Sequence, residues 1–330
     1  DGHSHTVMEN KQVQDASGKA VTLTQTGSYF ANVGEMTIAA DGTITTKLIP
    51  THEGMDAGIA AMQTSWVNTV DDMLGEKIAV GDSDFYVSDP ATGKRRIRSA
   101  ETNLGDFVAD GIYTYFNEVE KLHCDVAIMN GGGIRADVPA GDWTFKTCKQ
   151  VSPFGNVACL MSVTGKQIQD ALEFAARFAG EDGKENGGFL QVAGATYEIH
   201  TDIPNTVQTD EKNVWIGSAT GTPRVQNVKI YDKTSGSYLP LDPGATYALA
   251  GMNYTLRNLG DGFAMFDGAE LIKDYVSEDY LVMSTYAMTF DGADAAGLPH
   301  LSSANSPLAA YPGYLLNYEQ PYGAGRITIL

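Results

Sequence analysis

The sequence contains little cysteine and little positive charge for its length. Its 330 residues include three cysteines, Cys124, Cys148 and Cys159. An odd number without CxxC spacing excludes a disulfide scaffold and a zinc ribbon. Only 22 residues are Lys or Arg against 41 Asp or Glu, so the formal net charge is −19. This excludes a protein that coats nucleic acid, because binding a phosphate backbone needs a field of the opposite sign. A small anionic ligand remains possible where a few arginines gather.

The sequence also has no apolar run long enough for a membrane span. The longest charge-free stretch, residues 295–318, contains three prolines and two glycines, which predicts a long loop. The chain opens on Asp1-Gly2-His3-Ser4-His5 and has neither an initial Met nor a signal peptide, so we expect a cut or processed chain. Hydrophobic residues make up 43% of the sequence, which is ample for a packed core.

The pattern of apolar residues predicts a small β section, a helix and then a larger α/β region. Residues 33–38 and 43–48 form a predicted hairpin around the turn residues Asp41-Gly42. Helical spacing over 56–74 predicts a linker helix. Thr102 or Asn103 is expected to cap another helix, and the sequence TGKQ at 164–167 matches a capping box. Strands are predicted at 125–129, 225–231, 247–251 and 326–330. We therefore expect a mixed α/β fold.

A glycine-rich segment, NGGGIR at residues 130–135, directly follows one predicted strand. Residues 131–136 match GxGxxA, but no helix can follow because Pro139 and Gly141 come next. No acidic residue stands about twenty positions later, so a dinucleotide-binding turn is excluded. What remains is a strand end where the backbone can approach a ligand closely, with Arg135 beside it. The alternative is a glycine-rich turn without a ligand.

Four of the 22 basic residues fall within the five positions KRRIR at 94–98. One interpretation is a solvated surface run. The sharper interpretation places Arg96 and Arg98 on one face of an extended stretch, just before the helix that begins near Asn103. An arginine over a helix N-terminus forms a phosphate site, since it adds a bidentate fork to free N–H groups.

Two aromatic residues stand in or near turns. Phe154 lies in PFGN at 153–156, and Tyr254 precedes GDGF at 260–263. Each ring could be an ordinary core residue. If the two rings faced each other they would grip a nucleobase, each stack contributing about 1–3 kcal/mol.

Two histidines, His3 and His5, stand near the N-terminus. On an extended segment they point to opposite sides, so they could each serve one of two metal ions. Two ligands are too few for such a site, and a disordered terminal HxH is the alternative.

Five motifs occur in order over residues 98–263: ETNLGD at 101–106, NGGGIR, PFGN, GFLQVAG at 188–194, and GDGF. Together they resemble the 5′-nucleotidase family, which includes UDP-sugar hydrolases and 2′,3′-cyclic nucleotide phosphodiesterases. The resemblance implies three segments. Residues 1–50 would be the end of a metallophosphoesterase domain, 51–75 a helical linker, and 76–330 a C-terminal nucleotide-binding domain with a mixed sheet and packed helices.

The resemblance also implies roles for individual residues. Arg98 and Arg135 would contact phosphate, Phe154 and Tyr254 would stack on the base, and Asp261 would accept from the ribose hydroxyls. Asn130, Gly133 and Asn156 would contact the nucleoside or phosphate. His3 and His5 would each bind one of two divalent ions such as Zn, Mn or Mg. The family's other metal ligands are absent from the sequence, so we expect this chain alone to lack a stable metal site and to be inactive.

The function implied is substrate specificity in a metal-dependent nucleotide phosphohydrolase, a phosphoric ester hydrolase that would work outside the cytoplasm. Its substrate would be a nucleotide or nucleoside, and its partner the missing N-terminal metallophosphoesterase domain. Neither a nucleic-acid partner nor a membrane span is expected. Specificity for a 2′,3′-cyclic nucleotide or a UDP-sugar is one alternative. A non-catalytic nucleotide-binding module is another.

Overall fold

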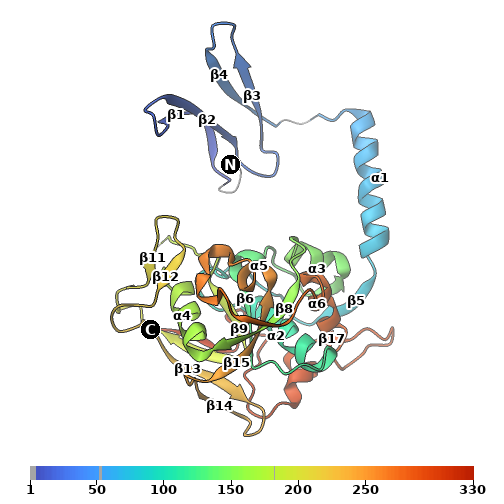
Figure 1. Cartoon of the computed structure of the whole chain (residues 1–330). Coiled ribbons are helices and arrows are strands. Elements are labelled where there is room, and N and C mark those ends of the chain that lie inside the picture. The colour runs from blue at the N-terminus through green and yellow to red at the C-terminus, as the bar shows by residue number, and fades with distance from the viewer. Residues whose placement is uncertain (1–4, 52–53, 182) are drawn as a thin grey trace. The chain divides into compact units, whose positions relative to one another are not determined.

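The computed structural model describes residues 5–51, 54–181 and 183–330. The chain divides into two compact units, Asp1–Asn68 and Thr69–Leu330, and the division falls inside helix α1 (Ala57–Leu74) (Figure 1). The three predicted segments, 1–50, 51–75 and 76–330, stay a prediction about domains. Each unit is described by itself below.

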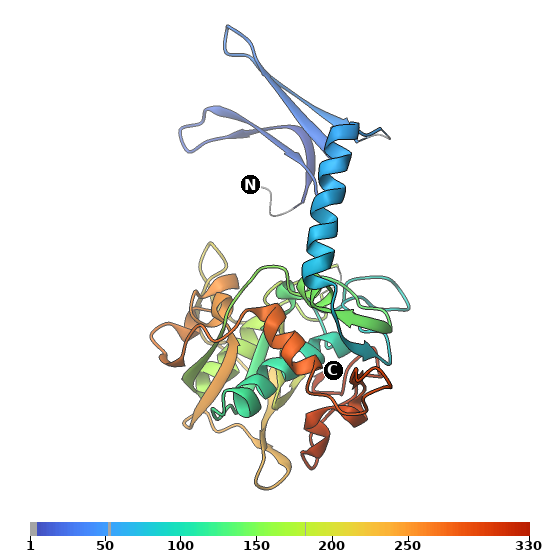
Figure 2. The ribbon, with the colours of Figure 1, turned by 90° about the vertical axis from the view of Figure 1, so that its right-hand side faces the viewer.

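The first unit is built from two antiparallel hairpins, which Figure 2 shows as long two-stranded ribbons. One pairs β1 (Val7–Gln14) with β2 (Ala20–Thr26), and the other pairs β3 (Asn32–Ile38) with β4 (Ile44–Pro50). The predicted hairpin is confirmed. Its turn closes because Gly42 adopts φ 85° and Asp41 Oδ1 accepts from Thr43 N at 2.9 Å. None of the described residues of this unit is buried, so its apolar side chains form no closed core.

The helix predicted over 56–74 is confirmed as α1, and its role as a linker stays a prediction. Asp56 caps it, because its Oδ1 accepts from the backbone N of Gly58 at 2.9 Å and of Ile59 at 3.0 Å. The apolar side chains of α1 are exposed, including Trp66. No described helix of the protein is both long enough and apolar enough to cross a membrane.

A five-stranded mixed sheet forms the centre of the second unit (Figure 1). Its strand order is β16 (Glu270–Lys273), β8 (Ala158–Thr164), β15 (Thr246–Met252), β6 (Val126–Asn130) and β9 (Leu190–Ala193). Only β15 and β6 run parallel, with Leu249 opposite Val126. Strand β6 is buried along its whole length, as expected for a short apolar run covered on both faces.

Helices cover both faces of this sheet. Alternate residues of β6 enter two different cores: Ala127 and Met129 pack with α2 (Asn103–Thr114) and α6 (Asp279–Ala287), whereas Val126 and Ile128 pack with α4 (Gly165–Ala175). This follows from the period-two alternation of side chains along a strand. The three cysteines are free and buried, with Cys124 in the core as predicted.

Smaller sheets complete the unit. One has the order β14 (Ser237–Pro240), β13 (Val225–Asp232), β10 (Ala195–Ile199) and β18 (Ile327–Ile329), and another β17 (His300–Leu301), β5 (Lys77–Gly81) and β7 (Gly141–Thr144). A short hairpin pairs β11 (Gln208–Thr209) with β12 (Trp215–Gly217). The remaining elements are α3 (Phe145–Val151), α5 (Asn253–Leu256), η1 (Tyr115–Val119), η2 (Gly131–Gly133), η3 (Gly260–Gly262), η4 (Ala264–Phe266), η5 (Ser303–Asn305) and η6 (Pro307–Ala310).

Local signals in the sequence set the helix starts. Thr102 caps α2, with its Oγ1 accepting from Gly105 N at 3.1 Å. At α4, Thr164 Oγ1 accepts from Gln167 N at 3.2 Å while Gln167 Oε1 accepts from Thr164 N at 2.9 Å. Both predicted caps are confirmed, the second as a complete capping box. The fold is mixed α/β, as predicted.

A buried ionic cluster ties the C-terminal segment to α2. Arg326 Nη2 lies 2.7 Å from Asp110 Oδ2, and Tyr318 and Tyr314 donate to the same carboxylate at 2.7 and 2.8 Å. The Glu101 carboxylate accepts from the backbone N–H groups of residues 325–327. This network fixes the last strand, β18, against α2.

Candidate nucleoside-phosphate site

The glycine-rich segment forms a tight turn, η2, at the end of β6. Gly131 N donates to Phe189 O and Gly132 N donates to Gly187 O, both at 2.7 Å. A Cβ on Gly131 would overlap the carbonyl oxygen of Ile97. Glycine is therefore required here because three backbone segments, 97–98, 131–133 and 186–189, approach one another closely.

Arg135 extends from this turn toward Phe154. Its Nη1 donates to Gly132 O at 3.3 Å, and its Cζ lies 5.7 Å from the centroid of the Phe154 ring. The sequence placed the two residues in separate motifs, and the fold brings them together. The pair combines a guanidinium with an aromatic face, which suits a ligand that carries both an anion and a ring.

Arg98 belongs to the same positively charged region. Burial and the neighbouring charges of Arg95 and Arg135 lower the pKa of Arg98, while Glu185 and Asp261 oppose this. Its Nη1 lies 3.9 Å from Glu185 Oε2. Within the described part of the chain, Arg98 Nε is buried without a hydrogen-bond partner. An anion beside Arg98 and Arg135 would relieve their mutual repulsion.

The predicted extended conformation of residues 96–98 is wrong, and with it the predicted phosphate site at the N-terminus of α2. Arg96 to Ala100 form a turn, with Ser99 N donating to Arg96 O at 2.8 Å, and not an extended stretch. Arg96 Nε donates to Glu101 O at 2.8 Å, and its guanidinium stacks on Tyr322. The first turn of α2 is fully buried, and Asn103 N and Gly105 N already donate to Pro321 O and Thr102 Oγ1. The fold thus directs Arg96 away from Arg98.

Asp261 holds a second group of predicted residues together. It occupies η3 with φ 55°, a left-handed conformation that aspartate tolerates better than most residues. Its Oδ2 accepts from Asn130 Nδ2 at 3.1 Å and its Oδ1 accepts from Tyr254 OH at 3.0 Å. Burial, followed by the charge of Asp261, raises the pKa of Tyr254 to about 12. Tyr254 therefore stays a neutral ring whose orientation is fixed.

Asn130 and Gly133 lie at the centre of this arrangement. Asn130 is buried, and its Oδ1 has no hydrogen-bond partner within the ranges that the structure describes. A Cβ at Gly133 would come within 3.1 Å of that oxygen and would meet Met129. A free acceptor beside a residue without a side chain is a position where a ligand donor could bind.

Phe154 stands on an exposed turn, and 58% of the residue is accessible to solvent. Gly155, with φ 66°, reverses the chain after it. Asn156 N then donates to Asp279 Oδ2 at 3.1 Å, and Asp279 N donates to Asn156 O at 2.8 Å. The backbone of Asn156 anchors the turn, and its predicted contact with a ligand remains a prediction.

The turn of Phe154 is also bonded to the segment that carries Tyr254. Val157 N donates to Asn253 Oδ1 at 2.9 Å, and Asn253 N donates to Val157 O at 2.8 Å. Because Asn253 immediately precedes Tyr254, residues 153–157 and 253–254 lie side by side. Both rings are reachable from solvent, since Tyr254 is 37% exposed.

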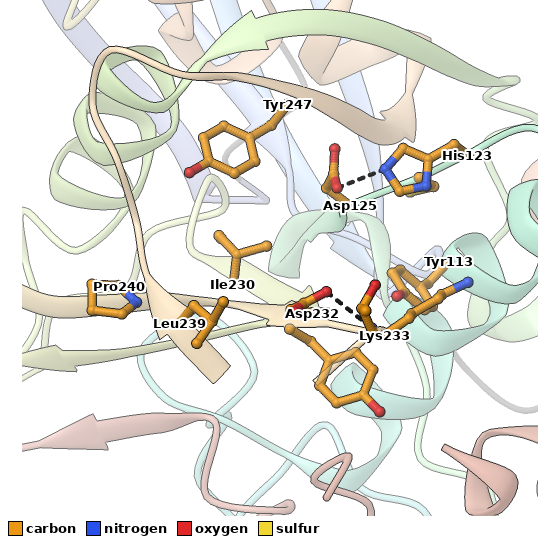
Figure 3. A pocket seen from close by; sticks show the side chains of 12 residues that line it. Tyr113, His123, Asp125, Ile230, Asp232, Lys233, Leu239, Pro240 and Tyr247 are labelled. Carbon is orange, nitrogen blue, oxygen red and sulfur yellow. Dashed lines mark hydrogen bonds and ion pairs between the residues drawn. The ribbon is translucent and has the colours of Figure 1, made fainter. Parts of the chain in front are cut away.

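A separate cavity of about 440 Å³ contains none of the predicted residues (Figure 3). It lies between Tyr247, Ile230 and the pair His123–Asp125, whose Nε2 and Oδ1 are 2.8 Å apart. Asp125 Oδ2 already accepts from Ala248 N at 2.8 Å. The carboxylate of Asp125 is thus already bonded within the protein. We therefore do not assign the nucleoside-phosphate site to this cavity.

Similarity to known proteins identifies the family of this chain. The family model described as "5′-nucleotidase, C-terminal domain" matches residues 79–268, more than half of the chain. This chain belongs to that family. The matched region contains every predicted site residue except His3 and His5.

Curated relatives of this 5′-nucleotidase C-terminal domain have phosphoesterase and nucleotidase names. The chain is 30% identical over 295 residues to the trifunctional nucleotide phosphoesterase protein YfkN of Bacillus subtilis, covering 86% of this chain and 18% of that protein. It is 31% identical over 160 residues to the NAD 5′-nucleotidase of Haemophilus influenzae, covering 48% and 23%. The family is therefore one of hydrolases. The chain spans less than a third of either relative.

Solved structures share the fold. The 5′-nucleotidase precursor of Thermus thermophilus superposes with a TM-score of 0.61 at 24% identity, covering 100% of this chain and 58% of that one. A putative 5′-nucleotidase of Staphylococcus aureus gives 0.60 at 16% identity, covering 99% and 55%.

The described residues alone do not fit a metal centre. His3 lies outside the described residues, and the ring of His5 packs edge-on against Tyr29 with centroids 6.3 Å apart. Across the described ranges, no three His, Cys, Asp or Glu side chains form a group that could hold an ion. The metal-binding roles of His3 and His5 stay predictions.

Two residues near the site were missed by the sequence analysis. Asp279 binds the turn of Phe154, and an acidic pair before an apolar helix was its only signal. Arg177 stacks on Phe174, with Cζ 4.0 Å from the ring centroid. Burial lowers the pKa of Arg177 to about 10, whereas Asp261 raises it. Nothing in the sequence distinguished Arg177 from other helix-end arginines.

Proposed function

We propose that this domain binds the substrate of a nucleotide phosphohydrolase. Phe154 and Tyr254 would hold the base, Asp261 the ribose hydroxyls, and Arg98 and Arg135 the phosphate. The observation that carries the proposal is the convergence of these residues, from four separate segments, around the glycine turn at the end of β6. Asn130, Gly133 and Asn156 would complete the contacts.

The electrostatics support an anionic ligand at this place. The chain as a whole carries −19, so a phosphate is repelled by most of its surface. Arg98 and Arg135 create a local field of the opposite sign and can form charge-assisted, forked hydrogen bonds. Asp261 lies at the other end of the group, and its carboxylate retains lone pairs for hydroxyl donors after accepting two hydrogen bonds.

We further propose that hydrolysis takes place in a longer protein. A metallophosphoesterase domain outside this chain would supply most of the ligands for two divalent ions, and the whole protein would work outside the cytoplasm. The names of the relatives and the lack of buried residues among the described part of the first unit support a partner domain. In this scheme the present domain contributes orientation: binding energy from the base places the phosphate for reaction.

Calorimetry on this chain tests the binding proposal. AMP, adenosine and ribose 5-phosphate are titrated without added metal. AMP is expected to bind tightest, because it alone uses the rings, the ribose site and the arginines together. Failure of both AMP and adenosine to bind would overturn the proposal. A 2′,3′-cyclic nucleotide or a UDP-sugar that binds better than AMP would instead assign one of the alternative specificities.

The non-catalytic alternative is separated by the longest natural form of the protein. Hydrolysis of AMP that depends on divalent metal supports the phosphohydrolase. Tight AMP binding without turnover at any metal concentration supports a binding module.

A further inference from the structure

The turn that carries Phe154 depends on one buried carboxylate. Asp279 lies in the first turn of α6 and is only 3% exposed. Its Oδ2 accepts from Asn156 N at 3.1 Å, and its backbone N donates to Asn156 O at 2.8 Å. Its Oδ1 accepts from Tyr280 N at 2.8 Å. One residue thus binds both polar backbone groups of the last residue of the turn.

We propose that Asp279 is a positioning residue that fixes the Phe154 ring for the nucleobase. The inference rests on the proposed function. Phe154 is mostly exposed, so few contacts of the ring itself hold it in place. The anchors of the turn therefore decide where the ring stands. Asn253 provides the other anchor, through Val157, and keeps the turn in register with Tyr254.

Asp279 acts through its ionised form. A carboxylate accepts from both Asn156 N and Tyr280 N, whereas a carboxylic acid gives up one acceptor position to a proton. The charged groups that face it are Lys149 from α3 and Glu278 from its own element. Lys149 favours the ionised form and Glu278 opposes it, and the two are themselves paired at 3.5 Å.

Burial is the largest influence on this carboxyl and raises the pKa of Asp279 to about 6. The backbone N–H groups of Tyr280 and Asn156 counteract burial in part. Because the ionised form holds the turn, the affinity for the base is expected to rise between about pH 5 and pH 7.5. Ligand contacts to the phosphate and ribose do not involve Asp279, so the pH profile of ribose 5-phosphate binding should be the same in the parent and in Asp279→Asn.

The experiment measures affinity for adenosine and ribose 5-phosphate by calorimetry at pH 5 and pH 7.5. The variants are Asp279→Ala, Asp279→Asn and the matched control Asp267→Asn, which changes an exposed aspartate of the same domain. At pH 7.5, Asp279→Ala should lose about tenfold in adenosine affinity, as expected for removing a hydrogen bond to a charged acceptor. Its affinity for ribose 5-phosphate should be unchanged.

The pH profile provides the second readout. The parent and Asp267→Asn should bind adenosine better at pH 7.5 than at pH 5. Asp279→Asn should bind equally at both, because an amide does not titrate in this range. If the Ala variant fails to fold, the Asn variant carries the test alone.

The outcomes separate this inference from the proposed function. A parent that binds neither adenosine nor AMP overturns the proposed function and the inference with it. If the parent binds adenosine, unchanged affinity in Asp279→Ala overturns the inference alone. So does an equal loss for ribose 5-phosphate, and so does a pH profile that survives in Asp279→Asn.

Discussion

An exposed aromatic ring beside an arginine suggests a contact completed by another molecule. Phe154 presents an apolar face to water although the protein has buried cores on both faces of its main sheet. Arg135 Cζ lies 5.7 Å from the ring centroid, and 58% of the residue remains accessible to solvent. A base stacked on this ring would remove apolar area from water and gain the preferred ring geometry.

Phe154→Ala should therefore weaken adenosine binding by about 1–3 kcal/mol, the contribution of one base stack. The free energy of unfolding should change little, because the ring is mostly exposed. Calorimetry and urea denaturation measure the two quantities. Tyr322→Ala is the matched control, since Tyr322 is also an exposed ring in contact with an arginine, Arg96. Equal adenosine affinity in the Phe154 variant and the parent would remove this ring from the site.

Arg135→Ala should weaken AMP binding more than adenosine binding. In the proposed site the guanidinium would contact the phosphate of AMP and would have no such partner in adenosine, and a hydrogen bond to a charged group contributes about 1.5–3 kcal/mol. Arg135→Lys keeps the charge but loses the planar fork, so it should recover part of the lost affinity. The measurement is the ratio of AMP to adenosine affinity in each variant. Equal losses for both ligands would contradict a phosphate role.

At the scale of elements, the sequence predicts those turns and helix caps that depend on residues close together in the chain. The hairpin around Gly42, the cap at Thr102 and the capping box at Thr164 each follow from contacts within a few positions, and all three are confirmed. The turn at Arg96 was missed because a hydrogen-bonded reversal, set by tertiary packing, replaced the expected extended strand.

Pairings between residues far apart in the sequence could not be predicted either, because they too depend on tertiary packing. Asp279 and Asn156 are 123 positions apart, and Asn130 and Asp261 are 131 apart. No local pattern marks such partners. The resemblance supplied the site residues that the motifs contain, yet only the fold shows that Arg135 stands beside Phe154. Their ligand roles remain predictions.

The packing of the glycine turn gives a prediction at this scale. Gly131→Ala places a methyl group against the carbonyl oxygen of Ile97 and should push segment 97–98, with Arg98, away from the turn. Overpacking of this kind costs about 1–3 kcal/mol of stability. AMP affinity should fall as well, because Arg98 moves. Gly244→Ala is the control, since its nearest neighbour lies at an ordinary 3.5 Å. A Gly131 variant with parental stability and AMP affinity would contradict the close approach.

At the scale of the whole molecule, the buried ionic cluster links the last strand to α2. Arg326→Met leaves Asp110 buried without its charge partner, which should cost about 3–5 kcal/mol of stability. Adding Asp110→Leu should restore part of that loss, because it removes one of the two buried carboxylates that face Arg326; the other, Asp106, stays in place. Urea denaturation of Arg326→Met, Asp110→Leu and the double variant provides the test. A double variant that loses the sum of the two single losses would show that the two residues do not act as a pair.

Stability and ligand affinity should respond to pH in opposite directions through Asp279. Its raised pKa means that the folded protein binds this proton more tightly than the unfolded chain does. Between about pH 4 and pH 6 the native state then carries more protons, so the contribution of Asp279 to stability falls as pH rises. It is largest below the unfolded pKa and is lost once the pH passes the folded value near 6.

The measurable quantity is the free energy of unfolding of the parent minus that of Asp279→Asn, followed by urea denaturation from pH 4 to pH 7.5. This difference should decrease with pH by up to about 3 kcal/mol, since one pKa unit corresponds to about 1.4 kcal/mol. Subtracting the variant removes other titrating groups that the substitution leaves unchanged, such as Glu173, whose pKa burial also raises. A difference that stays constant with pH would show that the pKa of Asp279 is the same in the folded and unfolded states, so that this carboxyl is already ionised over most of the range. The turn of Phe154 would then be held equally at every pH, and its contribution to base binding would carry no pH dependence.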